Sequence, residues 1–431
     1  MVRRLAEQQA GWQARWTHQS PPPAFSYSTL LTPHSREWKS SALRHDARKD
    51  GTMTGTSAAS AIPSQRISSV DWMRGLVMIL MVIDHASMAF DGTHDPKDSA
   101  LYADAARMAL PAGEFFTRWI THLCAPTFVF LAGTSLAISV ERRVLKGTDA
   151  WTIDKNILIR GAIIALLDPT IISLGSGRWT FQVLMAIGVS MMCMAPLRRL
   201  PTWGLVAFGM GWIFLGEIPT SWVWHPPGNS SIGAAFTMAT YGSDVLSVKY
   251  PVIPWLAIMV LGWVFGRHLL RVAAGTTRVS GKMVLWISGL LSLAAFAFVR
   301  WNAGYGDMWL HRSDGSWQQW LHVSKYPPSL TYYTLELGIL FLALALLRTI
   351  EMKIGTRQNG VFLVFGQTAM FFYLVHRLMF EVPATYFGLR GFGNLTTTYI
   401  AATIMLVLLY PACRWYRGFK LKHRNTFLRL I

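Results

Sequence analysis

The chain contains a succession of apolar runs, most of them long enough to cross a membrane, separated by short polar loops. A helix needs about 20 mainly apolar residues to span the hydrocarbon core of a bilayer. Ten segments meet or nearly meet this length, and they lie approximately at residues 70–90, 115–140, 156–175, 179–197, 202–217, 251–270, 281–300, 329–349, 361–380 and 395–413. The fifth is short and the third contains Asp168-Pro169, so these two depart furthest from a regular span. The pattern predicts an all-α, polytopic transmembrane helical bundle of about ten spanning helices.

The first 65 residues contain no such run and are rich in Ser, Pro, Arg and Gln. They lack the apolar core of a secretory signal peptide, and their acidic residues argue against an organelle transit peptide. We expect residues 1–65 to be a disordered basic arm, or to reflect a start assigned too early, with Met53 as the initiator. A transmembrane domain over 66–413 and a basic tail over 414–431 follow.

Charged residues alternate from loop to loop along the chain. Every second loop is basic, with Arg142, Arg143, Lys146 and Lys155, then Arg198 and Arg199, then Arg267, Arg271, Arg278 and Lys282, then Arg348, Lys353 and Arg357. The loop at 91–114 is instead crowded with acidic residues. Since short basic loops stay in the cytoplasm, both termini are predicted to be cytoplasmic. The longer loops at 91–114, 218–249 and 301–328 are predicted to face outside.

Composition agrees with a protein embedded in a lipid bilayer. The chain is 52% hydrophobic and 14% charged, whereas soluble domains carry about 25% charged residues. The net charge of +18 is spread over short loops and forms no single patch, so nucleic-acid binding is not expected. The cysteines, Cys124, Cys193 and Cys413, lie within apolar runs without CxxC spacing, so neither a disulfide framework nor a structural zinc or other metal site is expected.

Several ionisable residues fall inside the predicted spans, where such groups are costly and usually functional. Asp71 and Arg74 lie at the cytoplasmic end of the first span. Six groups from five spans share the outer half of the membrane: Asp84, His85, His122, Asp168, Glu336 and His376. Their common depth predicts a site in the outer half of the membrane.

The first span places two of these residues on one helix face. Arg74 and His85 are eleven residues apart, which brings them within about 20° of each other around a helix and about 16 Å apart along it. Asp71 lies one turn before Arg74 on nearly the same stripe. A cation near the cytoplasm and an imidazole near the outside suit a long, anionic, reactive ligand with the shape of acyl-coenzyme A.

Each residue also has a structural explanation. Arg74 can extend to the inner headgroups, and Asp71 can cap the helix or pair with that arginine. His85 can be a hydrogen-bonded packing residue, and Asp168 can bind backbone groups freed by the proline that follows it. The same alternative stays open for His122, Glu336 and His376.

Two motifs resemble a known family. Residues 66–75 (RISSVDWMRG) and 81–85 (MVIDH) resemble the opening of the heparan-alpha-glucosaminide N-acetyltransferase catalytic family, within the wider group of transmembrane acyltransferases. That group shares an arginine and a histidine on the first helix, ten residues intervening, which is the spacing of Arg74 and His85. Residues 122–135 resemble the second helix of the family, and shorter matches extend the resemblance to about residue 380.

The chain also departs from this family. The lysosomal animal members carry an asparagine where this chain has His85, and they carry an acid at the position of His122. Their proposed active histidine lies in the following loop, where His94 is this chain's only histidine and has no clear match. The chain therefore resembles the bacterial branch more closely, and heparan sulfate does not carry over as the acceptor.

The resemblance implies transfer of an acyl group, in the first place acetyl, from acetyl-CoA to a hydroxyl or amine of a sugar or glycan outside the membrane. The expected location is a bacterial plasma membrane. His85 is expected to act as general base, with Asp84 and His122 completing the catalytic group, and Asp84 turned about 100° away toward the acceptor or another helix. Arg74 and Asp71 are expected to bind the coenzyme. The acceptor is expected to meet Glu336, His376, Lys325 and Tyr326.

Two other classes stay open at this point. A secondary transporter would also carry charges near the midplane, but it usually shows inverted repeats, and none is recognisable here. A non-catalytic membrane protein would not need ionisable groups at one depth. The sequence leaves the acceptor and any homo-oligomeric assembly open.

Overall fold

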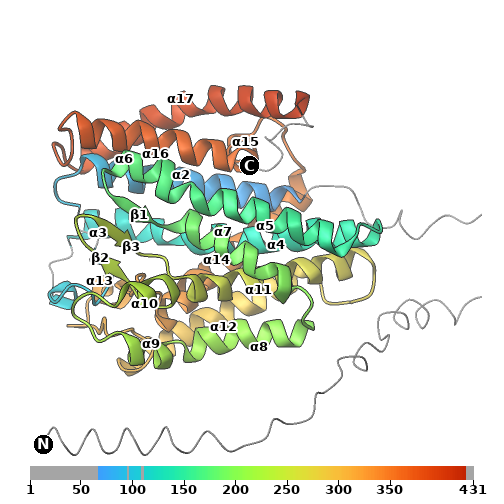
Figure 1. The fold of residues 1–431 in the computed structure, drawn as a ribbon, viewed down its shortest axis with the longest axis horizontal. Helices are drawn as coiled ribbons and strands as arrows, with labels where there is room; N and C mark the ends of the chain where they lie inside the picture. The colour runs from blue at the N-terminus through green and yellow to red at the C-terminus, as the bar shows by residue number, and fades with distance from the viewer. Residues whose placement is uncertain (1–66, 95–96, 108–110, 424–431) are drawn as a thin grey trace, which may run out of the picture. The chain divides into compact units, whose positions relative to one another are not determined.

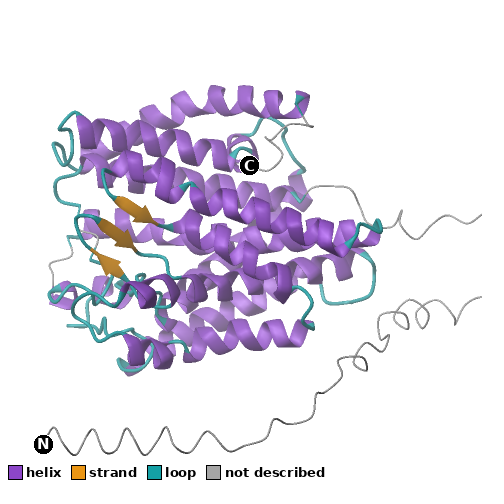
Figure 2. Cartoon of the chain, viewed as in Figure 1, coloured by secondary structure: helices purple, strands orange, loops and turns teal. Residues whose placement is uncertain are grey.

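The protein is described here from a computed structural model, in which residues 67–94, 97–107 and 111–423 are described. The predicted arm at 1–65, with Met53, and the last eight residues of the predicted tail lie outside the described residues. The described part of the chain is built mainly of helices, with three very short strands (Figure 2).

Seven helices or helical runs are long and apolar enough to cross a membrane. Four are single helices other than the first: α11 (Val252–Ala273), α12 (Gly281–Asn302), α14 (Leu330–Ile354) and α17 (Leu395–Lys422), and the first is α2 (Ser68–Phe90). The run Ala112–Leu145 consists of α3 (Ala112–Trp119), η4 (Ile120–Leu123) and α4 (Cys124–Leu145). The run Ala150–Ser176 consists of α5 (Ala150–Leu166), η5 (Asp168–Ile172) and α6 (Ser173–Ser176). The pair α15 (Val361–Gln367) and α16 (Ala369–Tyr386) is bent by 89° and adds an eighth span if counted as one. The prediction of an all-helical, multi-pass membrane protein is thus confirmed.

The remaining two predicted segments are shorter helices, α7 (Val183–Leu197) and α8 (Thr202–Leu215). With 15 and 14 residues, each falls short of the roughly 20 residues that a perpendicular span requires. The fourth predicted segment began at residue 179, but residues Trp179–Phe181 form strand β1 and the helix starts four residues later. All ten predicted segments are therefore helical, and seven or eight of them reach full spanning length in the described part.

Short elements gather at one end of the long helices (Figure 1). They include β1, β2 (Tyr241–Gly242), β3 (Leu246–Val248), α9 (Glu217–Val223), α10 (Ile232–Thr237) and α13 (Trp317–Leu321). The strand order is β1-β3-β2, with β1 parallel and β2 antiparallel to β3. Most of these residues belong to loops that the charge pattern places outside the membrane.

Loops predicted to share a membrane side also contact one another. At one end, the Ser68 amide donates to Glu351 Oε1 at 2.8 Å, and Arg267 donates to the Arg198 carbonyl at 2.6 Å. At the other end, the Lys325 amide donates to the Asp98 carbonyl at 2.9 Å. The alternation read from the charges thus agrees with the fold, while the face that each end meets stays a prediction.

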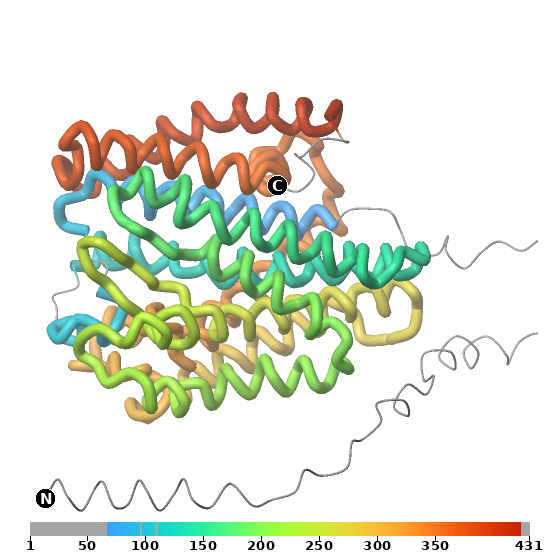
Figure 3. The backbone as a smooth tube through the Cα atoms, in the orientation of Figure 1, coloured from blue at the N-terminus to red at the C-terminus, as the bar shows by residue number. Residues whose placement is uncertain are grey.

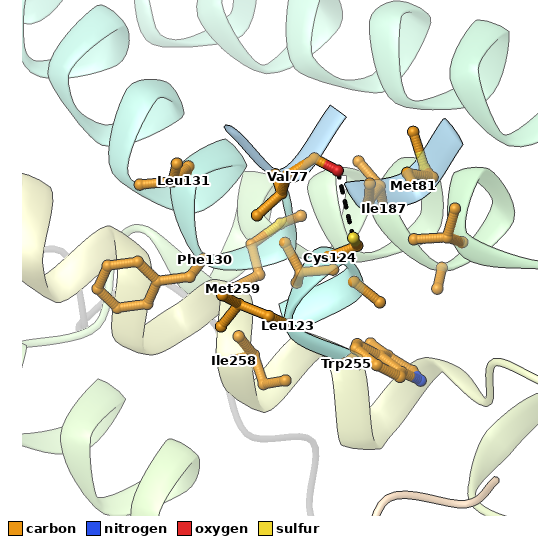
Figure 4. Packing of buried hydrophobic residues seen from close by; sticks show 14 of the residues in the cluster. Val77, Met81, Leu123, Cys124, Phe130, Leu131, Ile187, Trp255, Ile258 and Met259 are labelled. Carbon is orange, nitrogen blue, oxygen red and sulfur yellow. Dashed lines mark hydrogen bonds between the residues drawn. The ribbon is translucent and has the colours of Figure 1, made fainter. Parts of the chain in front are cut away.

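Helix α2 lies among several other helices and contacts α4, α14, α15, α16 and α17; it is the blue segment in Figure 3. A Cβ at Gly75 would lie 2.0 Å from the Phe362 carbonyl oxygen, so only glycine permits this close approach of α2 and α15. Figure 4 shows the apolar packing around Val77 and Cys124, where Cys124 Sγ donates to the Val77 carbonyl at 3.2 Å. The helix that carries the predicted site residues is therefore held in the interior of the bundle.

Candidate active site

The outer end of α2 meets α16 through two buried histidines. His85 Nδ1 lies 2.7 Å from His376 Nε2, and the two ring planes lie within 15° of each other with centroids 5.0 Å apart. The other ring nitrogen of His376, Nδ1, lies 2.8 Å from the Phe372 carbonyl oxygen one turn earlier in α16. Two histidines that are 291 residues apart in the sequence thus form one hydrogen-bonded chain that ends on the backbone.

The direction of this chain follows from its last member. A carbonyl oxygen only accepts, so His376 Nδ1 must donate to Phe372. In a neutral ring the second nitrogen is then an acceptor, so His376 Nε2 accepts from His85 Nδ1. His85 Nε2 is consequently the nitrogen without a proton. The fold therefore holds His85 in the tautomer of a proton acceptor.

Asp84, the neighbour of His85, faces a different part of the bundle. Its carboxylate binds the Arg118 guanidinium of α3 (Ala112–Trp119) and accepts from Thr121 Oγ1 at 3.0 Å. The same guanidinium donates from Nε to Asp98 Oδ2 at 3.0 Å, and its Nη2 lies 2.8 Å from that oxygen in an ion pair. Arg118 is therefore clamped between two carboxylates from separate segments. The prediction that Asp84 turns away from His85 toward another helix agrees with this arrangement.

His122 completes this network. Its Nε2 lies 3.1 Å from Asp98 Oδ2, and because a carboxylate accepts, Nε2 carries the proton. In a neutral ring Nδ1 is then bare, and this buried atom has no hydrogen-bond partner within the described residues. His122 and His85 each present one unprotonated ring nitrogen.

Asp98 lies in the outer loop before α3, and its ionisation is set by these neighbours. Burial alone would raise the pKa of its carboxyl group, but His122 and Arg118 hold it well below its usual value. Asp98 is therefore an anion throughout the physiological range. Neither Asp98 nor Arg118 was predicted as a site residue. The spacing of Arg118 and His122, one turn apart at the outer entry of the second span, was the signal that could have identified them.

The turn before α14 brings Lys325 and Tyr326 to the same place. The Lys325 and Tyr326 amides lie 2.9 and 3.3 Å from the Asp98 carbonyl oxygen, and Ser99 Oγ donates to the Tyr326 carbonyl. The Lys325 side chain is 3% exposed, and its charge acts on Asp84, His85 and Glu336. No ion pair or hydrogen bond engages its ammonium group within the described residues, although lysines are almost never buried unless paired.

Lys249 supplies a second cation at this turn. Lys249 Nζ and Lys325 Nζ each lie 5.4 Å from the centre of the Tyr326 ring, and the Tyr326 hydroxyl lies 3.4 Å from that of Tyr250. Burial would raise the pKa of the Tyr326 phenol, but Lys325, Arg118 and Lys249 lower it below its usual value. The outer mouth of the bundle therefore carries concentrated positive charge.

Glu336 lies about two turns after the start of α14 at Leu330. Its side chain is 1% exposed, and its Oε1 has no hydrogen-bond partner within the described residues. Its charge interaction is with Lys325. A buried carboxyl oxygen without a donor is rare in a stable fold and needs an explanation, such as a ligand.

Arg74 and Asp71 form an ion pair at the opposite end of α2, with Arg74 Nη1 3.1 Å from Asp71 Oδ1. Arg74 also donates to the Leu131 carbonyl at 3.0 Å and to Ser135 Oγ, both in α4. Since α2 is one uninterrupted helix, the predicted separation of Arg74 and His85 holds. Their neighbours differ, however, because α4 crosses α2 at the depth of Arg74 and α16 at that of His85.

Asp168 is not brought into the site and binds backbone instead. Its Oδ2 accepts from the amides of Gln182 and Met185, at 2.8 Å each, at the beginning of α7. The alternative of a structural role is thus supported, but the backbone groups belong to another helix rather than to a kink at its own proline. A residue that the sequence did not indicate, Arg377, is buried next to His376 and pairs with Glu381 at 3.1 Å.

His94 provides a test of the outer loop through pH. Its Nδ1 lies 2.8 Å from Ser87 Oγ, and burial lowers its pKa from 6.5 to about 4. The stability that it contributes is fully present above its unfolded pKa of 6.5 and is lost as the pH falls toward 4, because only the unfolded chain then binds the proton.

We therefore expect the melting temperature in detergent to fall between pH 6.5 and 4, and to fall less in His94→Asn. Thermal unfolding at pH 7, 6, 5 and 4 measures this difference. The exposed His311, in another outer loop, gives the matched control His311→Asn, which should follow the wild type. Equal acid losses in His94→Asn and the wild type would contradict the assignment.

Comparison with known proteins identifies the family of the chain. The model of the family described as heparan-alpha-glucosaminide N-acetyltransferase, catalytic, matches residues 66–299, just over half of the 431 residues. A search of curated proteins gave no match. The matched region contains Arg74, Asp84, His85, Arg118 and His122, whereas Lys325, Tyr326, Glu336 and His376 lie beyond it. This chain is a multi-pass membrane protein of the heparan-alpha-glucosaminide N-acetyltransferase catalytic family.

Proposed function

We propose that the protein transfers an acetyl group from acetyl-CoA on the cytoplasmic side to a hydroxyl or amine of a sugar or glycan on the outer side of a bacterial plasma membrane. The observation that carries this proposal is the buried His85–His376 pair, which leaves His85 Nε2 unprotonated. A neutral imidazole with a fixed tautomer is the usual general base for acyl transfer. Family membership supports acetyl transfer as the reaction class.

The coenzyme would bind with its phosphates toward the cytoplasmic end of α2. Arg74, oriented by Asp71, is one cation there, and Arg143 and Arg160 lie close enough for their charges to interact with Arg74 or with each other. Neither Arg143 nor Arg160 makes an ion pair within the described residues. Guanidinium groups bind phosphate in a bidentate manner. The thioester would then reach the depth of His85, about 16 Å further along α2.

The acceptor would enter from the outer side, where the turn before α14 carries Lys325 and Tyr326. Lys325, with Lys249 and Tyr326, is suited to hold an acidic group of the acceptor. Glu336 Oε1 would accept a hydrogen bond from a sugar hydroxyl or amine, which satisfies an atom otherwise left without a donor. His376 would contact His85 rather than the acceptor.

In the reaction, His85 Nε2 removes the proton from the acceptor as its oxygen or nitrogen attacks the thioester carbonyl carbon. The tetrahedral intermediate then collapses, the carbon–sulfur bond breaks, and the imidazolium returns its proton to the leaving thiolate. Asp84 stabilises the imidazolium through its charge, held in place by Arg118. His122, through its bare Nδ1, would accept a hydrogen bond from another hydroxyl or amine of the acceptor and so orient it.

An assay in sealed liposomes, with the acetyl donor outside and the acceptor inside, tests the proposed function. Purified protein is reconstituted in liposomes that enclose a mixture of amino sugars and neutral sugars, and [¹⁴C]acetyl-CoA is added outside. In molecules with their cytoplasmic face outward, we expect free CoA thiol to appear outside and acetylated sugar inside. A matched preparation of the wild type without sugar measures slow hydrolysis. If, with every sugar, the protein releases no more free CoA thiol than liposomes without protein, the proposal is wrong.

His376 should act through its neighbour. His376→Leu removes the acceptor for His85 Nδ1–H, so His85 can adopt the other tautomer, and we expect kcat to fall about 10-fold to 100-fold with little change in KM for acetyl-CoA. His376→Gln, whose amide oxygen can still accept, should retain more activity. The pH profile of kcat separates the two variants from a packing defect. Equal activity of the leucine and glutamine variants would contradict this role.

A further inference from the structure

A cavity of about 450 Å³ lies between α8, α11, α12 and α14, with Phe130 of α4 at its inner wall. This volume is in the range of ligand-binding cavities, about 300–1,000 Å³. Its walls are mainly apolar and include Ile213, Leu261, Phe265, Leu285, Leu291 and Phe341. The residues that α14 contributes occupy a different face of that helix from Glu336, so the cavity is separate from the candidate active site.

One end of this cavity is cationic. Arg271 and His268 lie one turn apart in α11, at the end that the predicted topology places in the cytoplasm. Arg271 is exposed, and its guanidinium group makes one hydrogen bond, to Thr202 Oγ1 at 3.3 Å, and no ion pair within the described residues. His268 Nε2 is buried without a hydrogen-bond partner there. The neighbouring Arg267 differs, because it pairs with Glu141 at 2.9 Å.

The length of the cavity matches one leaflet of a bilayer. Along α11 it runs from Arg271 to Leu261, ten residues or about 15 Å. The hydrocarbon core of a membrane is about 30 Å thick, so one leaflet contributes about half of that. Along α12 the lining residues run from Val284 to Ala295, about 16 Å, which gives the same length.

The cavity also has an opening toward the lipid, because the helices on its outward side pack loosely against each other. Helix α12 packs against α14 and touches α11 at few places, and α8 packs against α11, whereas α8 and α12 hardly contact each other. The outward side of α12 is exposed along its length, for example at Leu290 and Phe298. A molecule can therefore enter sideways from the membrane.

We propose that this cavity binds one anionic phospholipid of the cytoplasmic leaflet. Its phosphate lies against Arg271 and His268, for which the described residues provide no acidic partner, and one acyl chain extends among the apolar residues toward Ile213. A zwitterionic lipid would fit the apolar part equally well but would bring its own cation close to Arg271. The preference for an anionic headgroup is therefore the specific content of the inference, and it does not depend on the acyl-transfer proposal.

The test uses the full chain, purified and delipidated in a neutral detergent. Phosphatidylglycerol or phosphatidylcholine with identical acyl chains is added, and bound lipid is counted by native mass spectrometry alongside the melting temperature. We expect phosphatidylglycerol to bind at least about 10-fold more tightly, a difference of about 1.4 kcal/mol. Arg271→Gln should abolish this preference. Arg278→Gln removes an exposed arginine of the loop that follows α11, which does not line the cavity, and it should keep the preference.

A second variant tests whether the acyl chain of the lipid lies in the cavity. Ser288 lines the cavity from α12, and Ser288→Phe would fill part of it, so binding of both lipids should weaken. Equal binding of the two lipids by the wild type would overturn the proposal, as would an unchanged preference in Arg271→Gln. Loss of the preference in Arg278→Gln as well would show a diffuse basic surface and would also overturn it. Should Ser288→Phe fail to fold, the two arginine variants decide the question.

Discussion

His85→Ala is expected to lower the rate of acetyl transfer by about 10²–10⁴-fold, the usual contribution of a positioned general base. The physical reason is that His85 Nε2 is the one nitrogen of the His85–His376 pair left free to take a proton. Release of CoA thiol from acetyl-CoA in the presence of an accepted sugar measures the effect. Because the base acts in the transition state, kcat should fall and the KM for acetyl-CoA should change little.

Two controls separate chemistry from folding in this experiment. His311→Ala removes an exposed imidazole from an outer loop and should keep full activity. Acetyl-CoA should still raise the melting temperature of His85→Ala, since the phosphate-binding residues at the other end of α2 are unchanged. If His85→Ala consumes acetyl-CoA as fast as the wild type while His122→Ala does not, the base is His122 and the assignment of His85 is wrong.

Arg118→Gln is expected to cause the largest loss of stability in the outer half of the bundle, about 3–5 kcal/mol. Its guanidinium lies between Asp84 and Asp98, and the substitution leaves two buried carboxylates without their shared cation. Unfolding in a mixed-detergent titration measures the loss. Activity should also fall, because Asp84 then no longer has a fixed position beside His85.

The cause of that loss can be tested by partial rescue. In Arg118→Gln/Asp84→Asn one of the uncompensated charges is removed, so the double variant should be more stable than Arg118→Gln alone. Arg178→Gln, at an exposed position whose guanidinium makes a single hydrogen bond of 3.4 Å within the described residues, serves as the matched control and should be nearly neutral. A double variant less stable than Arg118→Gln would contradict the conclusion that Arg118 compensates the buried charges of Asp84 and Asp98.

Part of the candidate site was accessible from the sequence because depth in a membrane is a one-dimensional property. Span boundaries and loop charges fix how far each residue lies from the two surfaces, and that calculation placed Asp84, His85, His122 and Glu336 at one level. It could not distinguish Asp168, which shares this depth but binds the backbone of α7. The sequence therefore fixes the depth of a residue in the membrane, whereas its contacts at that depth depend on which helices are neighbours.

The residues that were missed show the same limit. Asp98 lies in a loop, where charged residues are ordinary, and only the fold brings it under Arg118 and His122. Lys249 likewise precedes a span at a position where a surface lysine is expected, yet it lies at the Tyr326 ring. Nothing in the local sequence of either residue indicates burial, because burial here results from the packing of separate loops over the bundle.

That this protein is a helical, multi-pass membrane protein follows from its amino-acid sequence alone, since runs of apolar residues and the alternation of loop charge depend on the bilayer and not on the neighbouring helices. The sequence also determined the positions of Arg74 and His85 along one helix, because helical geometry is local. The tertiary structure alone decided that His376 sets the tautomer of His85 and that Arg118 joins Asp84 to Asp98. Contacts between residues far apart in the chain follow from the order in which helices pack, and no local pattern encodes that order.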